Sequence, residues 1–315
     1  MRQQTMAPRA WAEMGLLALL WGGSFLTVRI ALDEIGPFWV VAHRVGWAAL
    51  ALWIVVLARG LAVPRGAAAW GALLMMGLLN NVVPFTLMAW GQLTIPSGLT
   101  SILNASTAIW GVLLAALVFA DERLSLRRAV GVLLGFLGVA TAIGLSSLAA
   151  LDITALAQLA VIAGTISYAV ASIWARKTLR GLAPEAAAAG MLTGATLVSV
   201  PLALWLEGPP DLGLAARTWG AIGYYAIAAT ALAYLLYYRV LAMAGSGNLT
   251  LVTLLIAPVA IVAGAVVLGE SLAPRAYGGF ALLTLGLLVL DGRVLRRPSS
   301  PSPSRRGPGR WRTRP

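Results

Sequence analysis

Ten apolar stretches account for most of this 315-residue chain, and each is bounded by proline, glycine or charged residues. About twenty apolar residues is the length that an α-helix needs to cross a bilayer. Hydrophobic residues make up 60% of the chain and charged residues only 11%, whereas about a quarter of a typical soluble domain is charged. The composition excludes a soluble enzyme and predicts an all-α integral membrane protein with ten transmembrane helices. The predicted spans are 11–31, 37–58, 67–90, 97–119, 127–144, 153–175, 184–206, 217–241, 247–268 and 274–291.

The positions of Lys and Arg predict how these helices are oriented. The first stretch lacks a small-residue cleavage site and is long enough to span, so we interpret it as a membrane helix and not as a cleaved signal peptide. With the N-terminus inside, 19 of the 23 Lys and Arg residues face the cytoplasm, and only Arg29, Arg217 and Arg275 face outward. Because cytoplasmic loops carry the excess of cations, we expect a multi-pass protein of the cell (inner) membrane with both termini cytoplasmic.

Residues 292–315 form a tail rich in Pro, Ser, Gly and Arg that has no apolar periodicity. Such a composition predicts a disordered basic cytoplasmic tail. The tail could touch anionic lipid headgroups, but we favour a solvated segment that helps to set the topology. The net charge of +12 is then explained by cations that set the orientation of the protein in the membrane, and no nucleic-acid partner is expected.

An internal repeat relates the two halves of the chain. Shifting the sequence by 148 residues aligns 122–139 with 270–287, and seven of these eighteen positions are identical, including Glu122 with Glu270. Each copy lies between the fourth and fifth span of its half. Because five is an odd number, the second half must cross the membrane in the opposite sense. The chain is therefore predicted to hold two inverted five-helix repeats, 11–144 and 153–291, of the kind that transporters use to alternate access around a site at the midplane.

The sequence resembles the EamA family of the drug/metabolite transporter superfamily over residues 11–291. The resemblance is carried by LLWGGSFLTVRIALDEIGPFWVVAHRVGWAALAL (17–52), by SILNASTAIWGVLLAALVFADERLSLRRAVGVLLGFLGV (101–139) and by YLLYYRVLAMAGSGNLTLVTLLIAPVAIVAGAVVLGESL (234–272). It implies ten helices and alternating access without ATP hydrolysis, with export of small metabolites, and it is closest to YddG-type bacterial amino-acid exporters. The family has proline in both halves where this chain has Trp110 and Pro258. We therefore expect a straighter fourth helix, with the Trp110 ring filling part of the cavity.

Amides and hydroxyls inside the spans are the first candidates for a substrate site, because buried polar groups in a membrane face the bundle interior or a hydrated cavity. Thr100, Asn104, Thr107 and Gly111 share one face of the fourth span. For the small residues we favour contacts between helices. The amides of Asn80, Asn81 and Asn104 each need several hydrogen-bond partners, so we favour cavity lining for them.

Aromatic residues within the spans are the second set of candidates. They could form a pocket for an apolar or aromatic substrate, although lipid-facing or core packing is an equal alternative for each one alone. Ser24–Phe25 and Ser167–Tyr168 occupy corresponding places in the first and sixth spans, which favours a midplane position for both pairs. The predicted aromatic substrate-binding residues are Trp21, Phe25, Phe85, Trp90, Trp110, Tyr168, Tyr234 and Tyr237, with Ser24 and Ser167 beside them.

Two ionisable residues, His43 and Arg44, lie inside the second span. Arg44 could attract a substrate carboxylate, but we favour a structural or gating role in which it pairs with Asp33 or Glu34 or reaches outward. His43 could contact substrate or titrate near neutral pH, and a satisfied interior histidine is the simpler interpretation. The other residues assigned to gating or structure are Pro84, Pro258, Glu122 and Glu270.

The remaining chemistry favours transport without a bound cofactor. The chain has no cysteine, one histidine and no GxxxxGK[ST] phosphate loop, so we expect neither a metal nor ATP. No acidic residue lies deep inside a predicted span, which favours gradient-driven movement.

The leading hypothesis is a secondary transporter that exports amino acids, aromatic or other apolar ones among them, and related small metabolites. The alternatives are efflux of drugs or nucleotide-type metabolites and, in a different class, a lipid-modifying membrane enzyme. The oligomeric state stays open.

Overall fold

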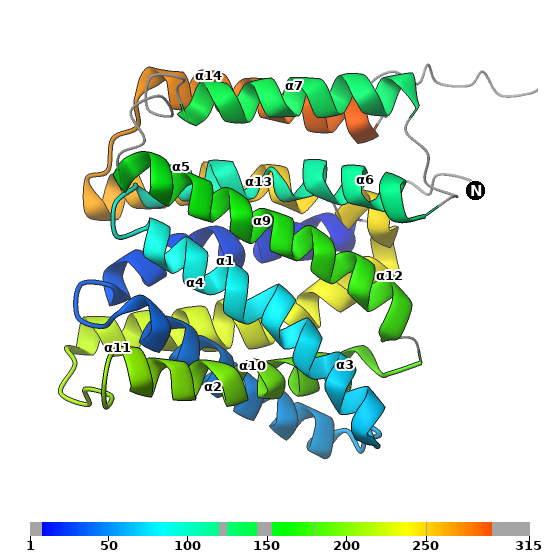
Figure 1. Ribbon diagram of the computed structural model, residues 1–315, viewed down its shortest axis with the longest axis vertical. Coiled ribbons are helices and arrows are strands. Elements are labelled where there is room, and N and C mark those ends of the chain that lie inside the picture. Colours follow the sequence, from blue (N-terminus) through cyan, green and yellow to red (C-terminus); the bar gives the residue numbers. More distant parts are fainter. Residues whose placement is uncertain (1–7, 120–124, 144–152, 180, 250, 292–315) are drawn as a thin grey trace, which may run out of the picture.

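The computed structural model describes residues 8–119, 125–143, 153–179, 181–249 and 251–291, and in this part of the chain every regular element is a helix (Figure 1). The helices of the first half are α1 (Pro8–Ala31), α2 (Pro37–Ala58), α3 (Ala67–Gly77), the π-helix η1 (Leu78–Val82), α4 (Val83–Gly91), α5 (Ser97–Asn104), α6 (Thr107–Val118) and α7 (Leu126–Ile143). The second half contains α9 (Ile153–Thr178), α10 (Pro184–Leu206), α11 (Ala216–Gly223), the π-helix η2 (Tyr224–Leu232), α12 (Ala233–Leu249), α13 (Leu251–Leu268) and α14 (Pro274–Asp291).

Seven of these helical stretches are long and apolar enough to cross a membrane, and Leu255–Leu268 and Pro274–Val289 are shorter apolar helices. The all-helical membrane fold is thus confirmed for the described residues, while the count of ten spans stays a prediction. The outer surface agrees with a lipid environment: Ile54 of α2 and Val266 of α13 are 68% and 78% exposed. A water-soluble protein rarely leaves so much apolar surface uncovered.

The third and eighth predicted spans are both interrupted by a π-helix. η1 joins α3 to α4 and η2 joins α11 to α12, at corresponding places in the two halves. A π-helical segment widens the turn and frees backbone groups, and such segments occur often at functional sites. Asn80, Asn81 and Thr230 all lie on these two segments.

The expectation of a straight fourth helix is wrong. This span breaks at Ala105–Ser106 into α5 and α6, whereas α13 runs unbroken through Pro258. The amide of Ser106 donates to the carbonyl of Leu103, three residues back, and the Thr107 hydroxyl donates to the Asn104 carbonyl at 2.7 Å. Side chains that bond to nearby carbonyls compete with the helical ladder, so a hydroxyl-rich segment breaks this helix without a proline.

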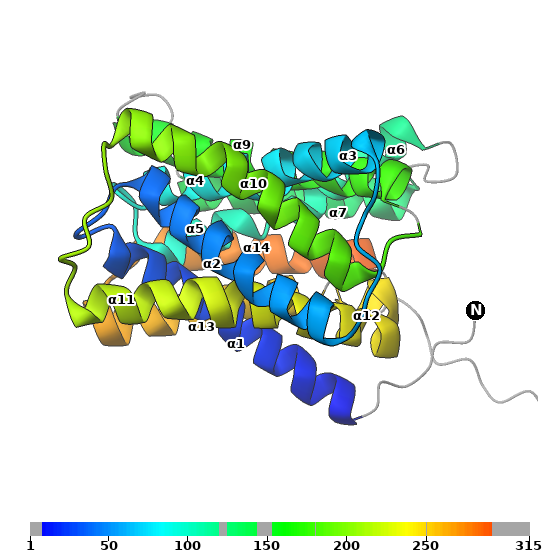
Figure 2. The ribbon, with the colours of Figure 1, turned by 90° about the horizontal axis from the view of Figure 1, so that it is seen from below.

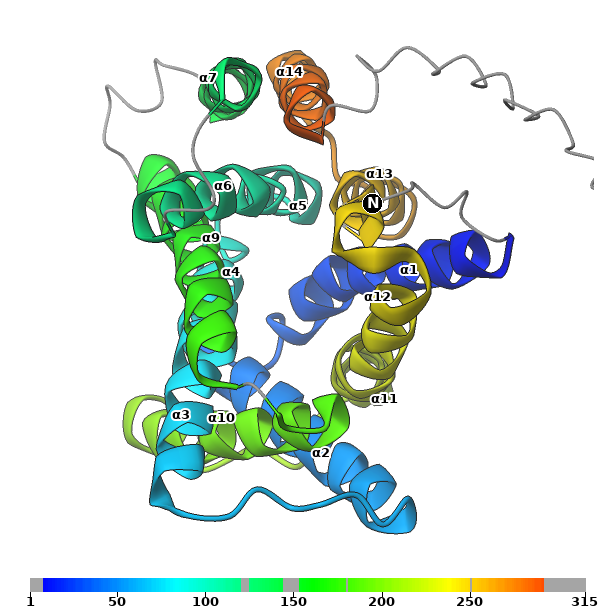
Figure 3. The same cartoon turned by 90° about the vertical axis from the view of Figure 1, so that its right-hand side faces the viewer.

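Helices α7 and α14 lie side by side and antiparallel, and glycines set their separation (Figure 3). A Cβ added to Gly286 would lie 2.7 Å from the Gly131 carbonyl oxygen, and one added to Gly279 would lie 2.6 Å from the Gly138 carbonyl oxygen. Gly131 aligns with Gly279 in the repeat, and Gly138 aligns with Gly286. Each contact is therefore the counterpart of the other, as an approximate two-fold axis between inverted repeats requires.

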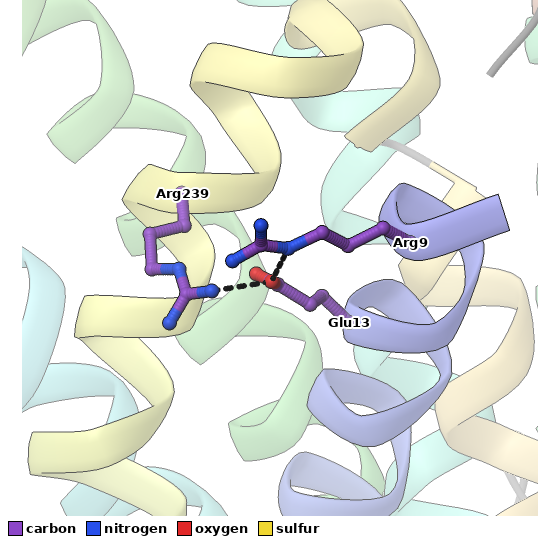
Figure 4. A network of polar contacts seen from close by, with 3 residues as sticks. All are labelled: Arg9, Glu13 and Arg239. Atoms are coloured by element: carbon purple, nitrogen blue, oxygen red, sulfur yellow. Dashed lines mark hydrogen bonds and ion pairs between the residues drawn. The ribbon is translucent and has the colours of Figure 1, made fainter. Parts of the chain in front are cut away.

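Ion pairs join the helices at the end of the bundle where the described chain begins. The carboxylate of Glu13 on α1 accepts hydrogen bonds from Arg9, at 3.1 Å, and from Arg239 of α12, at 2.5 Å (Figure 4). Arg59, just after α2, pairs with Glu185 of α10 at 2.7 Å. The second and third of these contacts each connect the first half of the chain to the second half.

Candidate functional site

A cavity of about 730 Å³ lies between the two halves. Helices α1, α2, α4, α9, α10 and α12 supply its walls, and Figure 3 shows these helices around the centre of the bundle. The predicted site residues that line the cavity are Trp21, Ser24, Phe25, Arg44, Asn80, Phe85, Asn104, Tyr168, Tyr234 and Tyr237. The inverted halves thus bring together residues more than 200 positions apart in the sequence, such as Trp21 and Tyr237, whose ring centroids are 5.9 Å apart.

The cavity is open at one end of the bundle and closed at the other. Ser172 and Pro184, near the end of α9 and the start of α10, line it and are exposed. Val28, Ala89 and Gln92, at the opposite end, also line it but are only 5%, 1% and 2% exposed. The open end is the one that carries the Arg59–Glu185 ion pair.

Two carboxylates from the second half seal the closed end by capping helices of the first half. Glu207 accepts hydrogen bonds from the backbone N–H groups of Phe38 and Trp39, at 3.0 and 2.9 Å, at the start of α2. Glu270 accepts bonds from the N–H and hydroxyl of Ser97, at 3.0 and 2.7 Å, at the start of α5. The first N–H groups of a helix have no partner within the helix and carry partial positive charge, so each contact joins the halves firmly.

Of the other residues assigned to gating, Glu122 lies outside the described residues. Pro258 lies within α13 and its side chain is exposed, away from the cavity. Pro84 follows η1 and is buried where α4 packs against α9.

Pro84 explains the role of Ser167. In the π-helical pattern the Leu79 carbonyl would accept the N–H of residue 84, which is a proline and has none. The Ser167 hydroxyl of α9 donates to this carbonyl at 2.7 Å instead. Ser167 therefore supports η1, and it is not among the residues that line the cavity.

His43 and Trp110 also lie outside the cavity. His43 lines a separate hollow of about 420 Å³ between α2 and α10. There Trp47 donates a hydrogen bond to its Nδ1 at 3.3 Å, and the rings of Trp39 and Trp219 lie within 5.8 Å. Trp110 packs edge-on against Phe136 of α7 at 4.9 Å. The expectation that the Trp110 ring fills the cavity is therefore wrong, because the break before α6 turns that side chain toward α7.

Trp90 packs against the apolar core around α5 and α9 and does not line the cavity. Asn81 is fully buried behind the wall, where its Nδ2 donates to the Tyr234 hydroxyl at 3.3 Å. Asn80, which does line the cavity, donates to the same hydroxyl at 3.0 Å. Tyr234 thus accepts two amide N–H bonds, and its own proton is left to donate toward another group.

Arg44 lies in the cavity wall, and no described residue is an acidic partner for it. Its Nε donates to the Thr230 hydroxyl at 3.0 Å, and its guanidinium carbon lies 4.0 Å from the centroid of the Phe85 ring. The predicted pairing with Asp33 or Glu34 is wrong. Asp33 binds Arg29 at 2.8 Å, and Glu34 accepts the backbone N–H of Ala215 at 2.9 Å.

Three residues that form or close the cavity were not identified as site residues from the sequence. Thr230 positions Arg44, Gln92 lines the closed end of the cavity, and Glu207 caps α2. A threonine within an apolar stretch and an acid after a span are common features, and their partners lie far away in the chain. Of the three, only Glu207 has a local signal in the sequence: it directly precedes Gly208-Pro-Pro, which indicates that a helix ends there.

The comparisons with known proteins agree with this fold. The model of the EamA-like transporter family matches residues 11–144 and again residues 155–290. Twenty-five chains of solved structures are similar to this one. One crystal structure among them matches 92% of this chain and 98% of its own, with a TM-score of 0.64 and 18% sequence identity, a likeness of fold alone. No curated protein matches the chain.

The family match covers both halves of the chain, and it agrees with the repeat seen in the sequence and with the reciprocal contacts of α7 and α14. The described helices supply the apolar spans that a multi-pass membrane protein needs. The chain belongs to the EamA-like transporter family and is a membrane transporter of the drug/metabolite type.

Proposed function

We propose that this protein exports amino acids, in particular aromatic or other apolar ones, and related small metabolites across the cell (inner) membrane, as YddG-type exporters do. The observation that carries the proposal is the central cavity, which combines aromatic rings with amide and hydroxyl groups. Its volume of about 730 Å³ is in the range typical of small-molecule sites. Trp21, Phe25 and Tyr237 offer apolar surface for a side chain, and Asn80 and Asn104 offer groups for the polar end of a substrate.

The proposed mechanism is alternating access between the inverted halves. The distribution of Lys and Arg favours a cytoplasmic position for both termini and for the open end of the cavity. In this orientation the structure corresponds to a state that loads substrate from the cytoplasm. The Glu207 and Glu270 contacts close the outer end, and they must break before substrate leaves.

The cavity also supports transport driven by the substrate gradient alone. Among the described residues that line it there is no Asp or Glu, the residue type that commonly carries protons within membrane transporters. Purified protein in liposomes should therefore move substrate without an imposed pH or sodium gradient. Strict dependence of flux on either gradient would contradict this mechanism.

The test of the function is counterflow in proteoliposomes loaded with a panel of amino acids and outside-labelled substrate. We expect uptake with aromatic and large apolar amino acids inside, and little uptake with lysine or glutamate inside. Trp21→Ala should reduce the counterflow of an aromatic amino acid about tenfold, because an aromatic wall is lost. Trp205→Ala is the matched control, since Trp205 is 79% exposed on the outer surface. Absence of counterflow with every amino acid in the panel would refute the proposal.

A further inference from the structure

The described wall of the central cavity carries a single charged side chain. Among the described residues that line it, Arg44 is the one ionisable at neutral pH, so the wall has one positive charge and no compensating carboxylate. A charge in the interior of a membrane protein is costly and is normally paired. A cavity of this kind favours an occupant that brings a negative charge of its own.

The surroundings of Arg44 fix the guanidinium but leave most of its donors free. Thr230 donates its own proton to the Tyr225 carbonyl at 2.7 Å, so its oxygen is held in place to accept the Arg44 Nε–H. Phe85 covers one face of the guanidinium at 4.0 Å. One of the five N–H groups of the side chain is thus used, and no acceptor among the described residues takes the four on its Nη atoms.

The neighbouring tyrosines add further donors. Tyr168 and Tyr234 line the same cavity as Arg44, and the Tyr168 ring packs edge-on against Phe85, whose ring covers the guanidinium. The Tyr234 hydroxyl already accepts bonds from Asn80 and Asn81, so its proton points to an acceptor elsewhere. The Arg44 guanidinium and the Tyr234 hydroxyl therefore supply donors to the same cavity, and a cluster of donors around a positive charge is the chemistry of an anion site.

We propose that Arg44 binds the carboxylate of the transported substrate. The planar guanidinium offers paired N–H donors that match the two oxygens of a carboxylate. The aromatic residues of the cavity then receive the apolar part of the same molecule. The inference rests on the proposed function, since it takes the central cavity as the substrate site, and it narrows the substrates to amphipathic carboxylates. Amides, esters and cationic analogues of these substrates are rejected.

The test compares tryptophan, indole-3-propionate and tryptophanamide as labelled substrates in proteoliposome uptake. The first two carry a carboxylate, and the third keeps the ring and amino group but lacks the negative charge. The wild-type protein should transport both carboxylates at least about tenfold faster than the amide, because a hydrogen-bonded charge pair is lost with the amide. Equal transport of tryptophan and tryptophanamide would overturn the inference while leaving the proposed function intact. Transport of none of the three would refute the proposed function for aromatic substrates and the inference with it.

Substitutions of Arg44 provide a second, independent test. Arg44→Gln should lower uptake of both carboxylates about tenfold or more and leave the slow uptake of the amide unchanged, so that discrimination disappears. Arg44→Lys should keep part of the discrimination because the charge remains. Arg29→Gln is the matched control, since Arg29 pairs with Asp33 and does not line the cavity. Size-exclusion profiles establish folding of each variant, and the wild-type comparison of acid and amide stands even if Arg44→Gln does not fold. Unchanged discrimination in a folded Arg44→Gln protein would overturn the inference.

Discussion

At the scale of single residues, the cavity is organised by hydrogen bonds that meet at one hydroxyl. Tyr234 accepts the Nδ2 groups of Asn80 and Asn81, one of which lines the cavity while the other is buried behind it. A buried donor that loses its partner costs the full price of its desolvation. The Tyr234 hydroxyl therefore fixes the shape of the wall and also presents its own proton to a substrate.

Tyr234→Phe should lower the stability of the protein more than Tyr237→Phe does. The first substitution leaves the buried Asn81 Nδ2 without its acceptor and leaves the Asn80 Nδ2 with only the weak acceptor sulfur of Met191 at 3.8 Å among the described residues, at a cost of about 1–3 kcal/mol in the free energy of unfolding. The second removes a hydroxyl for which the described residues provide no hydrogen bond, although both rings line the cavity. Thermal unfolding in detergent measures the difference, and equal shifts in Tm for the two variants would contradict this account of the wall.

At the scale of elements, interruptions in the helices add polar groups to a cavity whose walls are mostly regular helix. The π-helices η1 and η2 lie in corresponding places of the two halves and carry Asn80 and Thr230. Helix α5 ends at Asn104, which lines the cavity. Regular helices pack closely along their length, as α7 and α14 do through their glycines. Breaks in the ladder are what leave space and free polar groups between them.

Gly279→Ala should destabilise the protein, whereas Gly278→Ala should not. A Cβ at Gly279 would lie 2.5 Å from the Ala142 backbone nitrogen and 2.6 Å from the Gly138 carbonyl, and the backbone of α7 would have to move. Overpacking of this kind costs about 1–3 kcal/mol. Gly278 is its neighbour on α14 and has nothing within 4 Å, so the control carries the same change in helix propensity. Melting curves in detergent distinguish the two variants, and similar Tm values would show that α7 and α14 are not closely packed.

At the scale of the whole molecule, the two ends of the bundle are held by different kinds of contact. Ion pairs between half-exposed arginines and mostly buried glutamates join the halves at the open end. Carboxylates that cap helix N-termini join them at the closed end. An ion pair whose arginine stays half exposed to solvent contributes little to stability, whereas a capping carboxylate accepts hydrogen bonds at a helix N-terminus, where the donors have no partner within the helix. This difference explains why the cavity is closed at the end held by Glu207 and Glu270.

Glu207→Gln should shift the protein toward a state that is open at the currently closed end. The amide keeps one acceptor but turns an N–H group toward a helix N-terminus, so the charge-assisted bonds to Phe38 and Trp39 are lost. A loss of about 1.5–3 kcal/mol in the closed state changes the ratio of the two states by tenfold or more. The chain contains no cysteine, so a single Val28→Cys reporter in the closed end can be labelled selectively with a membrane-impermeant maleimide.

The rate of labelling at Val28→Cys should increase several-fold when Glu207→Gln is added. Asp211→Asn is the matched control, because Asp211 lies in the same loop and, among the described residues, bonds to the N–H of Gly213 alone, at 2.7 Å. Equal labelling rates in the Glu207 and Asp211 backgrounds would show that Glu207 does not hold this end closed.

Many of the residues that line the cavity could be selected from the sequence, and the selected residues that do not line it have a common explanation. Many of the polar and aromatic residues selected from the apolar spans line the central cavity, and the polar ones could be selected because lipid excludes polar groups unless they have partners. Which of them meet in the cavity depends on the rotation of each helix about its axis. In a soluble helix the apolar period marks the buried face, but a membrane helix is apolar on both faces. His43 and Arg44 are adjacent in the sequence, yet they lie in different hollows.

The sequence by itself determined the environment of the chain and its two-fold plan. The membrane environment follows from the length of the apolar stretches, and the two-fold arrangement follows from the spacing of the repeat. Both can be read along the chain without knowing how the helices pack. The tertiary structure alone decided that Glu207 caps a helix 168 residues away, that Ser167 replaces the donor missing at Pro84, and that Arg44 bonds to Thr230 instead of to Asp33 or Glu34. These contacts arise where separate helices cross, and a π-turn or a break changes which side chains meet there without leaving a clear mark in the local sequence.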